Sequence, residues 1–117
     1  MGIKVKRAYD KTENDDGTRV LVDRLWPRGV TKKKAEIDTW AREVGPENDL
    51  RKWFHEDPSG RLLEFTRKYS DYLKKNEEAK TCLSELRKLK SSLTLVTAVK
   101  DIDHSHIPTL VSFLKKK

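Results

Sequence analysis

Residues 93–99, with the sequence LTLVTAV, form the only nearly continuous apolar stretch of the chain. Segments with apolar residues at helical spacing lie on both sides of it. A short apolar stretch between two helices is typical of a strand that is buried on both faces in the middle of a sheet. We therefore expect a central strand here, in which Leu95, Val96 and Ala98 are almost completely buried.

Two further strands are predicted near the N-terminus. Residues 3–9, IKVKRAY, alternate in character as in a strand with one covered face, and residues 19–25, RVLVDRL, follow after a polar turn that Gly17 closes. No helix lies between these strands, so they are expected to be antiparallel if they pair. The second strand should end at residues 26–29, WPRG, because proline cannot donate to a sheet and glycine permits a tight turn.

Helix start signals divide the rest of the chain, and residues 37–44 between them are either a short third strand or an extended arm. Pro108 is tolerated only in the first turn of a helix, which favours Ser105 over Asp103 as the cap of the last helix. Cys82 falls on the apolar face of its helix and is expected to pack as a core residue. The expected helix caps are Thr31, Asn48, Asp57, Asn76 and Ser105.

This alternation of strands and helices predicts an α/β fold. We expect one small domain over residues 1–117, with a mixed, mostly parallel sheet of about three or four strands packed against helices. A long helical segment should separate the second or third strand from the last one.

The composition favours anionic partners. The chain of 117 residues has 26 Lys and Arg against 19 Asp and Glu, so its formal net charge is +7. Such a balance suits phosphate-bearing small molecules or nucleic acid. Lysines cluster at residues 32–34 and 115–117, but neither cluster contains the interleaved aromatic or glycine residues of a nucleic-acid module, and a solvated surface explains both equally well.

Other classes lack support in the sequence. A single cysteine excludes an intramolecular disulfide and a zinc site made only of cysteines. No stretch approaches the length of a membrane helix or a signal peptide, so we expect a soluble, cytoplasmic protein without a membrane partner. The glycine-rich, nucleophile and zinc motifs of dinucleotide enzymes, P-loop kinases, serine hydrolases and zinc peptidases are missing, and no cofactor is expected.

Polar side chains collect where two of the predicted strands end. Asp23, Arg24 and Arg28 follow the second strand, and a run from Lys100 to His106 follows the central one. In open α/β sheets, ligands bind outside the carboxyl ends of parallel strands and near helix N-termini. If the two strands are parallel, their polar ends open into one crevice.

Roles can be assigned to these residues as hypotheses. Asp23, Asp101 and His104 are candidates for moving a proton, and the last helix begins near Ser105 with unpaired N–H groups. Trp26 would form an apolar wall, while His55 and His106 would complete the site. Structural ion pairs and helix caps are alternative roles for the same side chains. The candidates for anion binding are Arg24, Arg28, Lys100 and Ser105.

A metal is the less favoured ligand of this crevice. His104 and His106 could share a metal if the chain between them is extended, with Asp101 or Asp103 adding a carboxylate. Lys100 and the two arginines across the crevice would repel a dication and attract phosphate. We therefore expect no metal.

Four strings carry a family resemblance: LVDRLWPRG, LRKWFHEDP, EFTRKY and LTLVTAVKDIDHSH. Together they resemble the YeaO-like branch of domain-of-unknown-function family 488 over nearly the whole chain. The resemblance implies a small cytoplasmic protein and no established reaction. The family's last motif commonly has Asn between its two histidines, where this chain has Ser105, and Ile107 stands where a small residue is frequent. Broader relatives carry a Cys-His-Arg motif near this point, but this chain has no cysteine there, so thiol chemistry is not carried over.

Three functions remain open. The first is a small enzyme or ligand-binding domain with a pocket for a phosphate-bearing or nucleotide-like anion. The second is a nucleic-acid-binding protein that uses its basic surface. The third is an interaction protein without catalysis, in which the polar strand ends are buried networks.

Overall fold

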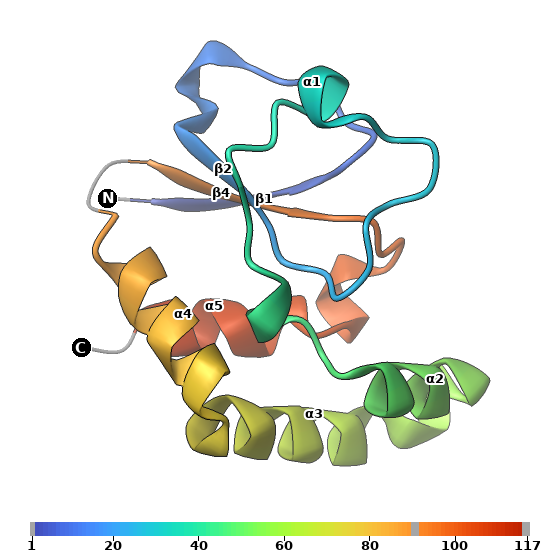
Figure 1. Ribbon diagram of the computed structural model, residues 1–117. Helices are drawn as coiled ribbons and strands as arrows, with labels where there is room; N and C mark the ends of the chain where they lie inside the picture. Colours follow the sequence, from blue (N-terminus) through green and yellow to red (C-terminus); the bar gives the residue numbers. More distant parts are fainter. Residues whose placement is uncertain (1, 90–91, 116–117) are drawn as a thin grey trace.

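The computed structural model describes residues 2–89 and 92–115, and in this part of the chain four strands form one sheet in the order β1-β4-β2-β3. Every neighbouring pair of strands is parallel, so the sheet is parallel throughout (Figure 1). The α/β class is thus confirmed. The strands are β1 (Ile3–Arg7), β2 (Thr18–Leu21), β3 (Thr39–Trp40) and β4 (Leu93–Thr97).

The apolar stretch at residues 93–99 supplies the central strand, as predicted. All five residues of β4 are buried, and Leu95 lies opposite Val5 of β1 and Val20 of β2. Leu95 and Val96 are both 0% exposed. The prediction for Ala98 was wrong: it lies beyond the end of β4, where the chain leaves the sheet, and is only partly buried.

Apolar residues on the two faces of the sheet belong to different clusters. Val20 and Leu95 point into the main core, which the helices complete. Leu21 and Val96 point to the other face, into a smaller cluster that includes Ile37. This alternation explains why a continuous apolar sequence is needed in β4 and why both of its faces are covered.

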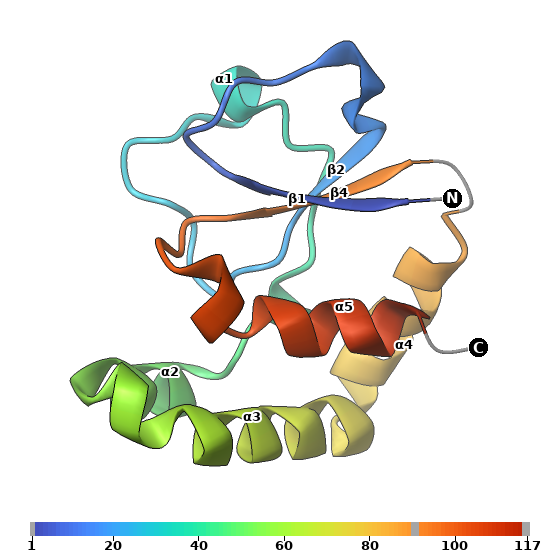
Figure 2. The same ribbon diagram turned by 180° about the vertical axis from the view of Figure 1, so that it is seen from behind.

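Most of the helical chain covers one face of the sheet. Helices α2 to α5 lie together below the sheet in Figure 1, and Figure 2 shows the same layer from behind. None of the described helices has the length and apolar character needed to cross a membrane. The helices are α1 (Lys32–Ala35), α2 (Asn48–Glu56), α3 (Pro58–Lys75), α4 (Glu77–Arg87) and α5 (Ile107–Lys115), with the 3-10 helices η1 (Asn14–Asp16), η2 (Arg42–Val44) and η3 (Ile102–His104).

Three of the predicted caps are present. The side chains of Thr31, Asp57 and Asn76 accept hydrogen bonds from backbone N–H groups in the first turns of α1, α3 and α4. The prediction for Asn48 was wrong by one residue, because Glu47 is the N-cap of α2 and makes no side-chain cap bond. The hydroxyl of Ser105 accepts from the N–H of Ile107, the first residue of α5, at 3.2 Å.

The connections between the strands differ in part from the prediction. β1 and β2 do not pair, because β4 lies between them and is parallel to both. The condition attached to the antiparallel expectation is therefore not met. Residues 37–44 contain the short strand β3, followed by η2. The long helical segment expected before the last strand is confirmed as α2, α3 and α4. Of the lysines at 115–117, Lys116 and Lys117 lie outside the described residues.

Candidate ligand-binding site

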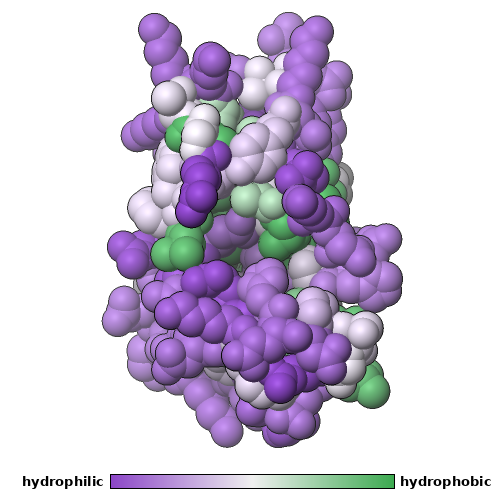
Figure 3. Space-filling view, turned by 90° about the vertical axis from the view of Figure 1, so that its right-hand side faces the viewer, coloured by the Kyte–Doolittle hydropathy of each residue, from purple (hydrophilic) through white to green (hydrophobic). Residues whose placement is uncertain are grey.

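A pocket of about 610 Å³ opens at the carboxyl ends of β2 and β4. Figure 3 shows the face of the molecule beyond the end of β4, where a hollow lies between an upper and a lower part and green, hydrophobic atoms flank it. Asp103, which the sequence offered as an alternative carboxylate, does not line this pocket, but the ten residues that were assigned to the crevice do: Asp23, Arg24, Trp26, Arg28, His55, Lys100, Asp101, His104, Ser105 and His106.

The parallel pairing of β2 with β4 explains why two distant segments meet here. Both strands end at the same edge of the sheet, so the loops that follow them form opposite walls. Gly45 brings a third segment close, because a Cβ at this position would collide with the backbone of Asp23 and Arg24. The chain that leads into α2 is thereby held against the end of β2.

Asp23 joins the end of β2 to the end of β4. Its Oδ1 accepts a hydrogen bond from the hydroxyl of Thr97 at 2.6 Å, and its Oδ2 accepts from the backbone N–H of Ala98 at 2.8 Å. The Nε2 of His106 lies 3.3 Å from Oδ1. Burial raises the pKa of Asp23, but His106 and these hydrogen bonds outweigh it and hold the pKa below its usual value. Asp23 is therefore an ionised, fully engaged carboxylate.

His106 is buried behind the pocket wall. It is 4% exposed, and its Nε2–H donates to the backbone carbonyl of Val22 at 3.1 Å. Its ring lies edge-on to the ring of Tyr69, with the ring centroids 5.8 Å apart. Tyr69 is itself buried, and its hydroxyl donates to the carbonyl of Val44. These contacts give His106 one fixed orientation.

His104 and Asp101 lie at the exposed rim. The Nδ1 of His104 is 2.9 Å from Oδ2 of Asp101, and the two side chains are 62% and 68% exposed. The two histidines are thus in different surroundings, one open to solvent and one buried. The residues that the structure describes contain one group of three possible metal ligands, Glu13, Asp15 and Asp16 in and beside η1, and lysine and arginine side chains pair with each of them.

Four cationic side chains line the pocket, and each has unused hydrogen-bond donors. The side chains of Arg28 and Lys100 are exposed and have no hydrogen-bond or ion-pair partner among the described residues. The Nε atoms of Arg24 and Arg51 are buried, and both lack a partner in the same part of the chain. Buried charged donors without partners are rare in native proteins.

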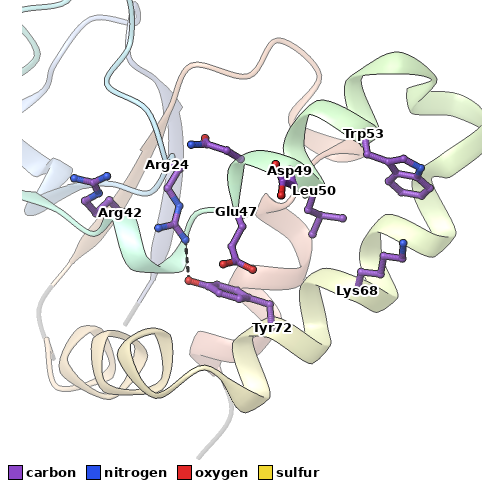
Figure 4. Close-up of a pocket in the computed structure, with 9 residues that line it drawn as sticks. Arg24, Arg42, Glu47, Asp49, Leu50, Trp53, Lys68 and Tyr72 are labelled. Carbon is purple, nitrogen blue, oxygen red and sulfur yellow. Dashed lines mark hydrogen bonds between the residues drawn. The ribbon is translucent and has the colours of Figure 1, made fainter.

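Arg24 also reaches a second hollow, of about 650 Å³, which α2 and α3 help to line. Its Nη2 donates to the hydroxyl of Tyr72 at 2.8 Å and to the carbonyl of Gly45 at 3.0 Å. Figure 4 shows the guanidinium directed at Tyr72 in this hollow. Arg24 therefore lies between the two cavities, with its tip held by protein groups.

The sequence reasoning missed Arg51. It lies on α2 four residues before His55, and Phe54 and Pro58 line the pocket from the same side. Positions separated by three, four and seven residues share one face of a helix. The expectation that His55 reaches the crevice therefore already implied Arg51 as a neighbour. The spacing of four residues between Arg51 and His55 is thus the sequence feature that could have identified Arg51.

Cys82 does not line the pocket, and it packs partly buried against the main core. Burial raises the pKa of its thiol to about 11. At pH 8 only about one thiol in a thousand is then ionised, against about one in four for a free cysteine. We expect alkylation by iodoacetamide at pH 8 to be roughly two hundred times slower in the folded protein than in urea. Equal rates measured by mass spectrometry would contradict this.

The protein is a small α/β domain with a parallel sheet and a basic pocket at the carboxyl ends of the two middle strands. The chain belongs to the family described as the "Inactive DUF488-N3 subclade", whose model it matches over residues 2–117. The YeaO-like resemblance is thus confirmed.

The relatives lie in bacteria. An "Uncharacterized protein" of Mycobacterium tuberculosis, Rv3073c, is 39% identical over 114 residues, which is 96% of this chain and 92% of the relative. The "Uncharacterized protein YeaO" of Escherichia coli is 37% identical over 118 residues, which is 98% of each chain. No solved structure matches this chain.

Proposed function

We propose that this protein is a ligand-binding domain that holds the phosphate group of a small molecule in the pocket at the ends of β2 and β4. One observation carries the proposal. Arg24 and Arg51 both line the pocket, and each has a buried Nε atom that lacks a partner among the described residues. A buried donor on a charged group costs free energy until it is paired, and an oxyanion would pair it.

The charges around the pocket support an anionic ligand. Arg24, Arg28, Arg51 and Lys100 face two carboxylates, and both carboxylates already have partners. Asp23 accepts from Thr97 and Ala98, and Asp101 lies beside His104. The cations therefore retain unused donors, and they outnumber the two carboxylates. Such an excess of one charge in a cleft raises the local concentration of the opposite ion.

Binding without chemistry fits the site better than catalysis. An ionised Asp23 cannot donate a proton, and its oxygens are occupied by neighbouring donors. The Nε2–H of His106 is committed to Val22. In this proposal Asp23 and His106 position the two loops, and the pair of Asp101 and His104 lies at the rim. The description of the family as inactive is consistent with this reading.

Replacing Arg28 with alanine is expected to weaken phosphate binding about tenfold, because a charge-assisted hydrogen bond is lost. The affinity is measured by isothermal titration calorimetry with inorganic phosphate, and thermal unfolding in phosphate and in sulfate gives a second readout. Arg51→Ala should act in the same direction. Arg67→Ala is the matched control, because Arg67 is exposed on α3, has no described partner and lines neither hollow.

Three results would overturn the proposal. The first is an affinity for phosphate that Arg28→Ala and Arg67→Ala change equally. The second is stabilisation by low concentrations of zinc that disappears in His104→Ala, which would make this a metal site. The third is an affinity for nucleic acid that falls steeply with salt while phosphate does not bind, which would favour a nucleic-acid-binding function.

A further inference from the structure

We infer that the ligand of this pocket is an aromatic phosphate, whose phosphate meets the cations while its planar ring stacks against Trp26. This inference rests on the proposed function, because it specifies the part of the ligand to which the phosphate group is attached. It starts from size. A pocket of about 610 Å³ lies in the range that holds drug-sized molecules, and a phosphate group alone fills only a small part of it.

The remaining space has apolar walls. Nine of the nineteen residues that line the pocket are apolar, and they come from both loops and from α2 and its flanks. Leu25 is 49% exposed and Val99 is partly exposed, so each presents apolar surface on one of the two loops. Exposed apolar surface inside a cleft is favourable only when a ligand covers it. A ligand with a polar body would leave this surface unused.

Trp26 is held in place before any ligand arrives. Its Nε1–H donates to the carbonyl of Val30 at 2.6 Å, and its ring meets the ring of Trp40 edge-on, with centroids 5.3 Å apart and planes at 76°. Trp40 is fixed in turn by a hydrogen bond of 2.8 Å from its Nε1 to the carbonyl of Asp23. Trp26 nevertheless remains partly exposed and lines the pocket.

A rigid aromatic ring is well suited to stacking. Binding costs less when the contacting side chain is already ordered, and offset stacking between rings adds to the free energy from apolar burial. The second hollow offers no comparable surface. There the Nζ of Lys68 lies 4.5 Å from the ring centroid of Trp53, and Arg61 lies over the same ring at 4.8 Å. The indole of Trp53 is thus already engaged by cations.

The position of Trp26 also links the two halves of the ligand. Trp26 and Arg28 are two residues apart in the same loop, and Arg24 precedes them. The loop therefore carries cations on both sides of the aromatic residue. A phosphate attached directly to an aromatic ring matches this arrangement. In such a ligand the charged group and the planar ring are close together, as Arg28 and Trp26 are in the loop.

Isothermal titration calorimetry with three probes tests the inference: inorganic phosphate, phenyl phosphate and ribose 5-phosphate. We expect phenyl phosphate to bind the wild-type protein at least about tenfold more tightly than the other two. Trp26→Leu should remove most of this advantage and weaken the binding of phenyl phosphate much more than that of inorganic phosphate. Leu25→Ser should reduce the advantage in the same way, and its exposed position makes it a safe second variant if Trp26→Leu fails to fold. Trp53→Leu is the control in the other hollow.

The outcomes separate the inference from the proposed function. If inorganic phosphate binds and phenyl phosphate binds no more tightly than ribose 5-phosphate, the inference fails and the phosphate pocket stands. An advantage of phenyl phosphate that survives both Trp26→Leu and Leu25→Ser also overturns the inference, because the ring then lies elsewhere. If none of the three probes binds, the proposed function itself is wrong.

Discussion

Replacing Leu95 with alanine is expected to lower the free energy of unfolding by about 2–5 kcal/mol. Leu95 is 0% exposed, lies in the middle of β4 and has β1 on one side and β2 on the other. Its neighbours belong to the sheet and to the packed helices, so the cavity left by the smaller side chain cannot close easily. Urea unfolding followed by circular dichroism measures the change.

Leu63 provides the control for this prediction. It is 90% exposed on α3, so Leu63→Ala should change the free energy of unfolding by less than about 0.5 kcal/mol. Hydrogen exchange supplies an independent check, because the amides of β4 should be among the slowest to exchange. Similar destabilisation by the two substitutions, or rapid exchange throughout β4, would show that β4 is not the centre of the fold.

Asp23→Asn is expected to lower the free energy of unfolding at pH 7 by about 3 kcal/mol, because a buried, paired charge is lost and one amide group must face a donor. The two carboxylate oxygens accept from Thr97 and Ala98, and Oδ1 lies beside His106, so in the asparagine variant the donors on one side face an NH2 group instead of an acceptor. Phosphate binding should weaken as well, because the two loops that form the pocket are no longer tied together.

The effect of Asp23→Asn should depend on pH in one direction. The pKa of Asp23 is lower in the folded protein than its usual value. A carboxyl group with a lowered pKa stabilises the fold above the unfolded pKa of about 3.9 and loses this contribution as the pH falls through the folded pKa. The difference between wild type and variant should therefore shrink below about pH 4. Asp103→Asn is the control, because Asp103 is exposed and has no described partner. If the difference in unfolding free energy between wild type and Asp23→Asn stays constant across this pH range, the assignment of an ionised Asp23 is contradicted.

Local signals in the sequence were sufficient for most elements of the fold but not for the short strand β3, which stayed open, or for the order of the strands. The apolar run at 93–99 identified the central strand, and Asp57 and Asn76 marked the starts of α3 and α4, because each signal depends on a few adjacent residues. Which strand lies between β1 and β2 depends on contacts between segments far apart in the chain. No local pattern encodes that choice.

The same division applies to the pocket. The rule that ligands bind beyond the ends of parallel strands gathered polar residues that the structure places around one pocket, because the rule needs only strand direction. The state of each side chain depends on packing that the rule does not contain. His106 is buried against Tyr69 while His104 is exposed, and Arg24 is drawn to Tyr72 of α3. These contacts come from helices whose approach to the sheet could not be read from spacing alone.

The position of β4 has a consequence for how the chain is made. Among the described residues, β1 pairs in the sheet with β4 alone, at residues 93–97, and β2 is otherwise joined only to the two residues of β3. During synthesis, β1 therefore has no partner in the sheet until residues 93–97 have been translated. The closure of such distant contacts carries a large entropic cost and slows folding. A nascent chain that stops before β4 has apolar strand residues without a sheet to join, so the sheet is assembled only after residues 93–97 emerge.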